Sequence, residues 1–343
     1  MTEGSRGRLG FGGLSTFLFA YELRNFWPVL QYSDSLVLRF RYSMIHHTHY
    51  DLIIIGGGPA GMAVAVGAAD AGLKKILLLE RHPRLGGILN QCIHVGFGLR
   101  YFKEELTGTE YAFRYNKLFE QTGTEVSTNS FVHKVTPEKK VTFVCPEGEF
   151  LISGAHVVLA TGCRERTREM LTTPGTRPAG IFTAGLAQEM VNIHGILPGK
   201  NVVIVGSGDI GLIMARRVTL EGARVHAVLE ILDHLSGLVR NKIQCLDDFG
   251  IPLYLQHEIL KIEGKNRVEG IRFRDNATGE VKKIACDTLL YSVGLIPERD
   301  LLMDAGIEPG TGYYVAGNAD YVHDLVDWVS KDGEKLGRAL RSA

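Results

Sequence analysis

One pattern of thirty residues occurs twice in this chain, and the repeat limits the possible folds more than any other feature. It covers DLIIIGGGPAGMAVAVGAADAGLKKILLLE, residues 51–80, and NVVIVGSGDIGLIMARRVTLEGARVHAVLE, residues 201–230. Each copy reads as an apolar strand, a glycine-rich turn, a helix of small and apolar residues, and a second apolar strand that ends in glutamate. Five matched positions, from the first glycines to Glu80 and Glu230, are all 150 residues apart. The repeat predicts two β-α-β units with parallel strands.

The first glycine-rich turn, GGGPAG, has the spacing of a dinucleotide site. Gly56 permits a tight turn, Gly58 lets backbone N–H groups approach a pyrophosphate, and Gly61 lets the helix pack closely on the strand. The phosphates would then lie at the positive end of the helix dipole. Pro59 suits the first helical turn, where its missing N–H costs nothing, and Glu80 is placed to accept hydrogen bonds from a ribose diol. The first unit is therefore predicted to bind a dinucleotide.

The second unit repeats these roles with Gly206, Gly208, Gly211 and Glu230. Two dinucleotide motifs in one chain predict two bound dinucleotides. The carboxylate of Glu230 would accept a hydrogen bond from the 2′-hydroxyl of NADH, and it would repel the phosphate that replaces this hydroxyl in NADPH. NADH is therefore the predicted nicotinamide nucleotide. The alternative is that Glu230 points to solvent and that the following loop sets the selectivity, with His234 favouring a phosphate.

The segments that follow the two units also resemble each other. Residues 125–162 read as short alternating strands that close on Thr161-Gly162, and residues 254–294 do the same and close on Gly294. Each unit therefore predicts a strand, a helix and a strand, followed by a small antiparallel meander and a return strand.

Composition excludes several classes of function. Lys+Arg and Asp+Glu both total 38, so no net charge favours nucleic acid or an anionic membrane as a partner. No apolar run reaches the roughly 18 residues of a membrane span. The five cysteines include no CxxC pair, and the nearest two, Cys145 and Cys163, are 18 residues apart. This spacing predicts no metal site and no thioredoxin-type motif, and it favours a reducing cytoplasm over a secreted disulfide scaffold.

Residues 1–48 differ from the rest of the chain. They contain a short apolar run broken by glycine, and the first regular strand is predicted to begin at about Asp51. We expect either a disordered leader or an upstream start, with Met44 as the start that the fold needs. The histidines of the segment IHHTH lack the cysteines or carboxylates that would complete a metal site, so we expect a solvated terminus there.

Four motifs, taken in their order along the chain, resemble those of the pyridine nucleotide-disulfide oxidoreductase superfamily of FAD/NAD(P) flavoproteins. They are GGGPAG with Glu80, ATG at 160–162, GSGDIG with Glu230, and AGNAD at 316–320. The resemblance covers the chain from about residue 50 to its C-terminus. It implies that the first site holds FAD and that the second site, inserted into the FAD domain, holds the nicotinamide nucleotide.

The resemblance implies an α/β fold of two Rossmann-like, doubly wound domains arranged as in glutathione reductase, without a separate dimerisation domain. The expected FAD-binding domain comprises residues 49–165 and 287–343, and the expected NAD(H)-binding domain comprises residues 166–286. Carried over residue by residue, the expected FAD contacts are Gly56, Gly58, Pro59, Ala60, Gly61, Glu80, Arg81, Gly87, Asn90, Val132, Thr161, Gly162, Gly317 and Asn318. The expected NAD(H) contacts are Gly206, Gly208, Ile210, Gly211, Glu230 and Gly294. Asn318 departs from the aspartate usual in the family, although an amide can still hydrogen-bond a hydroxyl.

Three longer stretches resemble a narrower group within this superfamily. They are LGGILNQCIHVGFGLRYFKEELTGTEYAFRY, ATGCRERTREMLTTPGTRPAGIFTAG and HDLVDWVS. The group comprises the FAD subunits found with opine, proline or glycerol-3-phosphate dehydrogenases, which lack the redox disulfide and work beside a second flavoprotein. The resemblance therefore implies a second flavoprotein dehydrogenase subunit as a partner.

Cys92 and His323 are the two candidate catalytic residues. Disulfide reductases of the superfamily carry two cysteines shortly after the glycine pair, whereas here Ile88 and Leu89 follow Gly87 and Cys92 has no companion within fifty residues. We expect Cys92 to pack as a small side chain; the alternative is a lone thiol that takes part in flavin chemistry. His323 precedes a helix whose N-terminus would point at the flavin, where a histidine can tune the ring or relay a proton.

Together these features predict an FAD-dependent NAD(P)H oxidoreductase that moves hydride between nicotinamide and flavin and passes electrons to a partner subunit or a small acceptor. Two alternatives stay open: a self-sufficient NADH oxidase or diaphorase, and a non-catalytic redox sensor that binds nucleotides. His94 is expected to be a structural histidine. The segment AGIEPGTGYYVAGN, residues 305–318, is shorter than the hairpin of the family, either because it is trimmed or because the gene model has lost part of it.

Overall fold

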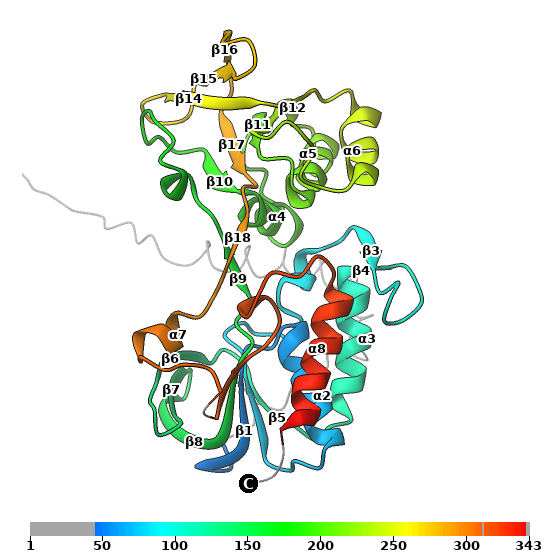
Figure 1. The fold of residues 1–343 in the computed structure, drawn as a ribbon, viewed down its shortest axis with the longest axis vertical. Helices are drawn as coiled ribbons and strands as arrows, with labels where there is room; N and C mark the ends of the chain where they lie inside the picture. The colour runs from blue at the N-terminus through cyan, green and yellow to red at the C-terminus, as the bar shows by residue number, and fades with distance from the viewer. Residues whose placement is uncertain (1–44, 311, 341–343) are drawn as a thin grey trace, which may run out of the picture. The chain divides into compact units, whose positions relative to one another are not determined.

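The computed structural model describes residues 45–310 and 312–340, which build two α/β domains joined by a two-stranded ribbon (Figure 1). The first strand, β1 (His49–Ile55), begins two residues before the expected position. Nearly all of the predicted leader, residues 1–48, and the predicted start at Met44 lie outside the described residues.

The first domain is built around a seven-stranded sheet. Its order is β5 (Glu125–Ser127), β2 (Ile76–Leu79), β1, β8 (Gly148–Leu159), β7 (Lys140–Cys145) and β6 (Phe131–Val135), and β19 (Tyr313–Val315) pairs with β8 outside this path. β1 is parallel to β2 and β8, whereas β6, β7 and β8 form the predicted antiparallel meander. The short segment before Gly317 still delivers its strand to the sheet, because β19 runs parallel to the end of β8.

Three helices lie together on one face of this sheet: α2 (Pro59–Asp70), α3 (Gly108–Glu120) and α8 (Val326–Ala339) (Figure 1). Glycine allows α2 and α8 to approach closely, because a Cβ at Gly67 would collide with the carbonyl oxygen of Glu334, and one at Gly337 would collide with that of Val64. On the other face, alternate residues of β1 and β2 pack against the meander and against α7 (Asp300–Asp304). The apolar strands of the first unit are therefore covered on both faces, as continuous apolar runs favour.

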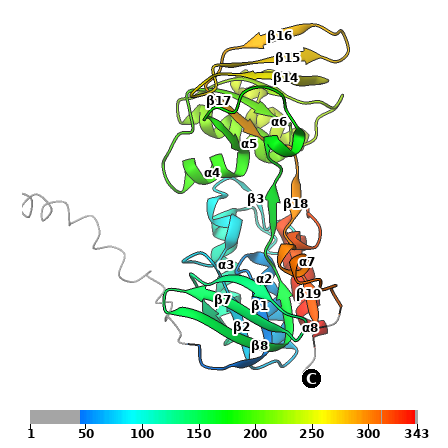
Figure 2. The same ribbon diagram turned by 90° about the vertical axis from the view of Figure 1, so that its left-hand side faces the viewer.

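The second domain repeats this architecture with a five-stranded parallel sheet. Its order is β10 (Ile181–Thr183), β17 (Thr288–Tyr291), β11 (Asn201–Val205), β12 (Arg224–Leu229) and β13 (Leu253–Tyr254). One face packs against α4 (Ala184–Asn192), α5 (Asp209–Leu220) and α6 (Val239–Cys245). The other face carries the antiparallel meander β14 (His257–Glu263), β15 (Gly270–Asp275) and β16 (Val281–Ile284), seen at the far end of the domain in Figure 2.

The boundary between the two domains differs from the expected one. The chain leaves the first domain through β9 (Cys163–Glu165) and returns through β18 (Leu295–Pro297), and these two strands pair antiparallel to form the ribbon. We expected the first domain to resume at residue 287, but β17 pairs with β10 and β11 in the second sheet. The reason is that β17 is the return strand of the second unit and belongs beside the strand that opens that unit.

The remaining elements are short, and they are η2 (Gly87–Gln91), β3 (Val95–Phe97), β4 (Leu106–Thr107), η3 (Arg168–Leu171), η4 (Asp247–Phe249) and η5 (Gly317–Ala319). Within the part of the chain that the structure describes, no helix combines the length and the apolar character needed to cross a membrane.

Candidate functional site

Both glycine-rich turns lie at the carboxyl ends of parallel strands, where α/β sheets bind their ligands. The first turn connects β1 to α2, and Glu80 follows β2. The second connects β11 to α5, and Glu230 follows β12. The two turns therefore occupy equivalent positions in their sheets, as the repeat predicted.

The first and third glycines of the motif are required by the packing of the protein itself. Gly56 has a φ angle of 112°, a conformation that favours glycine, and a Cβ there would collide with the carbonyl oxygen of Ala160. A Cβ at Gly61 would collide with the carbonyl oxygen of Gly56. The second turn repeats the arrangement, because Gly206 has a φ of 95° and abuts the carbonyl oxygen of Ser292.

Among the described residues, no packing contact requires glycine at the second position of either turn. Gly58 has a φ of −74° and Gly208 a φ of −65°, values that any residue adopts. The nearest atom to a Cβ at Gly58 would be Gly87 Cα at 3.9 Å, and the nearest to one at Gly208 would be Ser292 Oγ at 3.4 Å, an ordinary contact. A side chain would therefore fit the protein but would occupy the space through which a ligand approaches the backbone. Both turns thus fit the pyrophosphate of a dinucleotide.

The N-termini of the two following helices differ. α2 begins with Pro59, has no acidic residue in its first turn and receives no side-chain cap, so its positive end is open to an anion. α5 begins with Asp209, and Ser292 Oγ accepts the Gly211 N–H at 3.0 Å. Oδ1 of Asp209 accepts the Leu238 N–H at 2.8 Å. The N-terminus of α5 is therefore partly satisfied by the protein's own groups.

The buried Glu80 closes the first turn with two backbone hydrogen bonds. Its Oε2 accepts the Gly57 N–H at 2.6 Å, and its Oε1 accepts the His82 N–H at 2.7 Å. The Ser130 N–H donates to the carbonyl oxygen of Glu80 at 2.8 Å, which brings the start of β6 beside the end of β2. A carboxylate accepts about four hydrogen bonds, so Glu80 keeps capacity for ribose hydroxyls.

Glu230 is also buried, but four donors already surround it. Ser207 donates its N–H at 2.9 Å and its hydroxyl at 2.6 Å to Oε2, and the Ser236 hydroxyl donates to the same oxygen at 2.9 Å. Oε1 accepts only the Leu232 N–H, at 3.1 Å. Burial raises the pKa of Glu230, but these hydrogen bonds outweigh it and hold the pKa below its ordinary value. Glu230 is therefore a carboxylate whose Oε1 has room for one more donor.

Three further segments converge on the first turn. Gly87, with a φ of 54°, places its backbone against Gly58, because a Cβ there would lie 3.0 Å from Gly58 Cα. Gly317 brings η5 against α2, since its Cβ would lie 2.6 Å from the Cβ of Ala60. Gly162 follows β8 with a φ of 77° and has open space beside it. The predicted FAD residues of these segments are thus brought together around one turn.

Other residues predicted to contact a cofactor have local roles in the structure. Asn90 Nδ2 donates to the carbonyl oxygen of Leu85 at 3.0 Å and so shapes the loop before η2. The Thr161 hydroxyl donates to the carbonyl oxygen of Glu298 at 2.6 Å and fastens the end of β8 to the ribbon. The remaining residues are Val132 in β6, Ile210 in the first turn of α5, Arg81 on the surface, and Gly294 before β18. Their contacts with a cofactor stay predictions.

Cys92 is a buried thiol between the two domains. Its Sγ donates to the carbonyl oxygen of Ile88 at 3.3 Å and lies 3.8 Å from Oε1 of Gln188 in α4. A Cβ of Gly108, the first residue of α3, would lie 2.5 Å from the Cys92 Cβ, so the thiol is tightly enclosed. Burial raises the pKa of Cys92 to about 12. These surroundings favour the packing interpretation of Cys92 over the reactive thiol.

Asn318 and His323 form a connected pair beside Cys163. Oδ1 of Asn318 accepts the His323 N–H at 3.0 Å, and its Nδ2 lies 3.7 Å from Cys163 Sγ. The His323 ring contacts Asp332 Oδ2 at 3.1 Å, its centroid lies 4.1 Å from that of the tilted Tyr321 ring, and its side chain is 3% exposed. Protein groups therefore hold this ring in place, and its part in proton transfer stays a prediction.

Sequence reasoning missed two buried carboxylates of α8. Asp327 accepts the N–H groups of Arg100 at 2.9 Å and Tyr101 at 2.6 Å. Glu334 accepts the hydroxyl of Tyr115 at 2.7 Å, and burial together with this carboxylate raises the pKa of Tyr115. The two acids clamp the loop after Cys92 onto α8. Their spacing of seven residues, which places them on one helical face, was the signal that could have revealed them.

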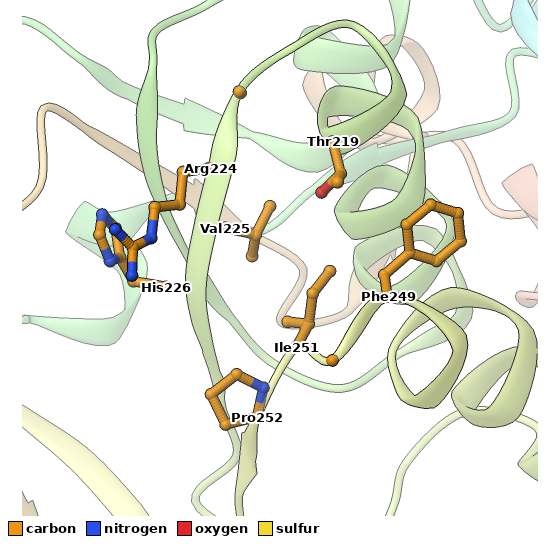
Figure 3. Close-up of a pocket in the computed structure, with 9 residues that line it drawn as sticks. Thr219, Arg224, Val225, His226, Phe249, Ile251 and Pro252 are labelled. Atoms are coloured by element: carbon orange, nitrogen blue, oxygen red, sulfur yellow. The ribbon is translucent and has the colours of Figure 1, made fainter.

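One cavity in the described part of the chain lies apart from both turns. It has a volume of about 420 Å³ and is lined by Arg224, His226 and Phe249 among other residues (Figure 3). Arg224 opens β12 whereas Glu230 follows its last residue, so the cavity lies at the opposite end of the strand from the second glycine turn. No group of three or more His, Cys, Asp or Glu residues among those described could hold a metal ion.

Comparison with known proteins agrees with this geometry. The family model described as pyridine nucleotide-disulphide oxidoreductase matches residues 50–323. One alkyl hydroperoxide reductase subunit, from Staphylococcus aureus (strain MRSA252), is 25% identical over 261 residues, which cover 75% of this chain and 48% of that protein. One opine oxidase subunit, from Agrobacterium tumefaciens (strain Ach5), is 27% identical over 292 residues, which cover 76% and 55%. The chain thus spans about half the length of the curated relatives it matches.

A solved structure shows the same fold over a similar range. The thioredoxin reductase of T. acidophilum matches with a TM-score of 0.68 and 21% identity, and the match covers 86% of this chain and 98% of that one. The likeness supports the predicted architecture of two dinucleotide-binding domains, one inserted into the other.

Proposed function

The chain belongs to the pyridine nucleotide-disulphide oxidoreductase family, and from this premise we propose that it is an FAD-dependent NADH oxidoreductase. The observation that carries the proposal is the pair of open second glycines, Gly58 and Gly208, which the packing of the protein does not require. We assign FAD to the first turn and NADH to the second. Once bound, the two cofactors would supply hydride chemistry between the nicotinamide and flavin rings.

The residues of the chain would bind and orient these cofactors. The open N-terminus of α2 would hold a pyrophosphate at Gly58, and Glu80 would accept the hydroxyls of the adjoining ribose. In the second domain, Oε1 of Glu230 would accept the 2′-hydroxyl of NADH, which makes NADPH the weaker ligand. Ser207 and Ser236 keep this carboxylate oriented by donating to its other oxygen.

We further propose that electrons leave through a second protein subunit or a small acceptor. The five cysteines are free thiols and include no CxxC pair, so no pair in the chain is spaced to take part in a local dithiol cycle. Two relatives, the opine oxidase and alkyl hydroperoxide reductase proteins, are themselves named as subunits. The unpaired thiols also support a cytoplasmic location.

Anaerobic reduction tests the proposal. The purified protein should be yellow, and it should bleach when NADH is added without oxygen. It should contain about one FAD per chain, because only one of the two glycine motifs is assigned to FAD. Slow reoxidation in air, together with rapid reoxidation by an added artificial electron acceptor, would support electron transfer to a partner. Rapid oxygen consumption by the chain alone would identify an NADH oxidase. A colourless protein that neither binds FAD nor oxidises NADH would contradict the proposal and favour a nucleotide sensor.

A further inference from the structure

The segment 238–241 lies directly beside the second glycine turn. The Leu238 N–H and the Asn241 Nδ2 both donate to Oδ1 of Asp209, each at 2.8 Å. Asp209 is the first residue of α5 and follows Gly208, the glycine with an open second position. The start of α6 is therefore fastened next to the place where a pyrophosphate would approach the second turn.

The same segment also touches the first domain. Nη1 of Arg240 lies 3.8 Å from Oε1 of Glu105, in the loop before β4. A Cβ at Gly96, in β3, would lie 3.1 Å from Nη2 of Arg240, so glycine allows the guanidinium to approach this strand. Arg240 therefore stands between the second dinucleotide turn and the β3–β4 hairpin of the other domain.

His94 approaches the same place from the first domain. It immediately precedes β3, and its ring packs 5.1 Å from the ring of Phe97. Burial lowers the pKa of His94, the carboxylate of Asp209 raises it, and the guanidinium of Arg240 lowers it further. By geometry, His94 lies two residues before Gly96, the glycine whose Cβ position is 3.1 Å from Nη2 of Arg240. A neutral imidazole keeps one N–H donor for a ligand.

The present partner of Arg240 does not hold it strongly. Arg240 and Glu105 are each 48% exposed, and their atoms are 3.8 Å apart, beyond hydrogen-bond distance. Exposed ion pairs of this kind contribute little to stability. A guanidinium binds phosphate through a planar fork of donors and makes stronger, charge-assisted hydrogen bonds. The exchange of Glu105 for a phosphate would therefore favour a bound dinucleotide.

Asp209 is a carboxylate at the start of α5 and would repel a phosphate bound there. Its Oδ1 already accepts two hydrogen bonds from the segment 238–241, and these donors partly offset its negative charge. Arg240 lies in the same segment and can offset the rest of the charge. The second turn therefore needs a cation that the first turn, with no acidic residue at the start of α2, does not need.

We infer that the second dinucleotide site is completed across the domain boundary, with Arg240 of α6 and His94 of the first domain contacting the pyrophosphate of the nicotinamide nucleotide. The inference rests on the proposed function, because it deepens the assignment of NADH to the second turn. Under it, both domains contribute binding groups to one ligand. His94 is then a binding residue for the nucleotide, where a structural histidine was the role that we expected from the sequence.

Titration calorimetry with ADP-ribose tests the inference on the full FAD-loaded chain. ADP-ribose carries the pyrophosphate but no nicotinamide, so its binding is measured without any redox step. Arg240→Gln should weaken binding by about tenfold or more, since hydrogen bonds to charged groups contribute this much. His94→Gln should weaken it by about threefold, as expected for a single neutral donor. Arg240→Lys, which keeps the charge but loses the fork, should lie between the parent and Arg240→Gln.

The chain offers matched controls at the opposite end of the second sheet. Arg224 and His226 line the cavity of Figure 3 and point to the same side of β12. Arg224→Gln removes the same charge as Arg240→Gln, and His226→Gln matches His94→Gln. Both controls should bind ADP-ribose like the parent, and all variants should retain the FAD content of the parent.

The outcomes separate the two claims. If the parent binds ADP-ribose and the Arg240 and His94 variants bind it equally well, the inference is wrong and the proposed function stands. If Arg224→Gln weakens binding as much as Arg240→Gln, the effect is one of general charge and the inference is again wrong. A parent that neither binds ADP-ribose nor bleaches with NADH would overturn the proposed function, and the inference with it.

Discussion

The two glycine-rich turns have a similar backbone conformation, but the protein groups that surround them differ. In the first, α2 begins with a proline and receives no side-chain cap, and Glu80 accepts only two backbone N–H groups. In the second, Asp209 opens α5, Ser292 accepts the Gly211 N–H, and four donors surround Glu230. The first turn leaves its polar groups open, and the second satisfies many of them internally.

This difference matches the two kinds of ligand that we propose. Backbone donors that no side chain of the protein caps can bond a ligand directly, so the first turn suits a cofactor that is held tightly. A turn whose groups already have partners is stable when empty, so the second suits a nucleotide that enters and leaves.

Replacing the second glycine of a turn by valine gives the largest expected effect. Gly58→Val places a branched side chain where a pyrophosphate approaches, so we expect FAD affinity to fall by at least about 100-fold, because several charged hydrogen bonds are lost. Gel filtration followed by absorbance should then yield apoprotein. Gly208→Val is the matched control: it should retain FAD but lose bleaching by NADH.

Two results would break the comparison of the turns. Stoichiometric FAD in Gly58→Val would mean that the first turn is not the flavin site. Loss of FAD in Gly208→Val would mean that the two turns do not act independently. We expect both valine variants to fold, because a Cβ would lie 3.9 Å from its nearest described packing neighbour at Gly58 and 3.4 Å at Gly208.

Replacing the glutamate of either turn, Glu230 or Glu80, by alanine gives the next largest effect. Oε1 of Glu230 has room for the 2′-hydroxyl of NADH, and a hydrogen bond to a charged group contributes about 1.5–3 kcal/mol, or roughly ten- to hundredfold in affinity. We therefore expect NADH to be preferred over NADPH by this factor in kcat/KM, and Glu230→Ala to abolish most of the preference. The substitution should also weaken both nucleotides, because it frees Ser207 and Ser236.

Glu80→Ala sharpens this test. It removes the equivalent carboxylate from the first turn, so it should lower FAD retention without changing the ratio of kcat/KM for NADH and NADPH in the fraction that keeps FAD. An unchanged ratio in Glu230→Ala would contradict the assignment of Glu230 to the ribose.

Replacing a buried cysteine by serine, Cys92 in the first domain or Cys245 in the second, gives the smallest expected effect. Burial raises the pKa of Cys92 to about 12, and burial also raises that of Cys245 in α6. If Cys92 only packs, Cys92→Ser should keep the rate of flavin reduction by NADH within a few-fold of the parent, like Cys245→Ser, since neither thiol is ionised at neutral pH. Anaerobic stopped flow measures both rates. A hundredfold loss confined to Cys92→Ser, with FAD still bound, would show that this thiol takes part.

Much of the fold could be predicted because its strongest signals are local. The apolar strands, the glycine spacing and the terminal glutamates predicted two parallel β-α-β units with a meander in each, and the structure contains them. The domain boundary at residue 287, taken from the family resemblance, was misplaced, whereas the repeat had already indicated a return strand of the second unit that ends before Gly294, and the pairing of β17 with β11 agrees with the repeat. Nothing in the residues 288–291 alone distinguishes the second sheet from the first.

The candidate site likewise combines local features that could be predicted from the sequence with contacts that could not. The tight turn at Gly56 and the close packing at Gly61 could be predicted, since a positive φ and a contact with the carbonyl oxygen of Gly56 arise within the turn itself, whereas the approach of a pyrophosphate to Gly58 stays a prediction. The clamp of Asp327 on the loop at Tyr101 could not be predicted, because the two residues are 226 positions apart and meet only when α8 docks.

The sequence by itself determined two dinucleotide turns, two terminal glutamates and no CxxC pair, because these depend on the order and spacing of neighbouring residues. Only the tertiary structure decided how those turns differ. Ser292 reaches Gly211 across 81 positions, and Arg240 reaches the loop of Glu105 from another domain. Such contacts form only when segments that are distant in the sequence pack together, since short-range hydrogen bonds and charges act only between groups that packing has already brought close.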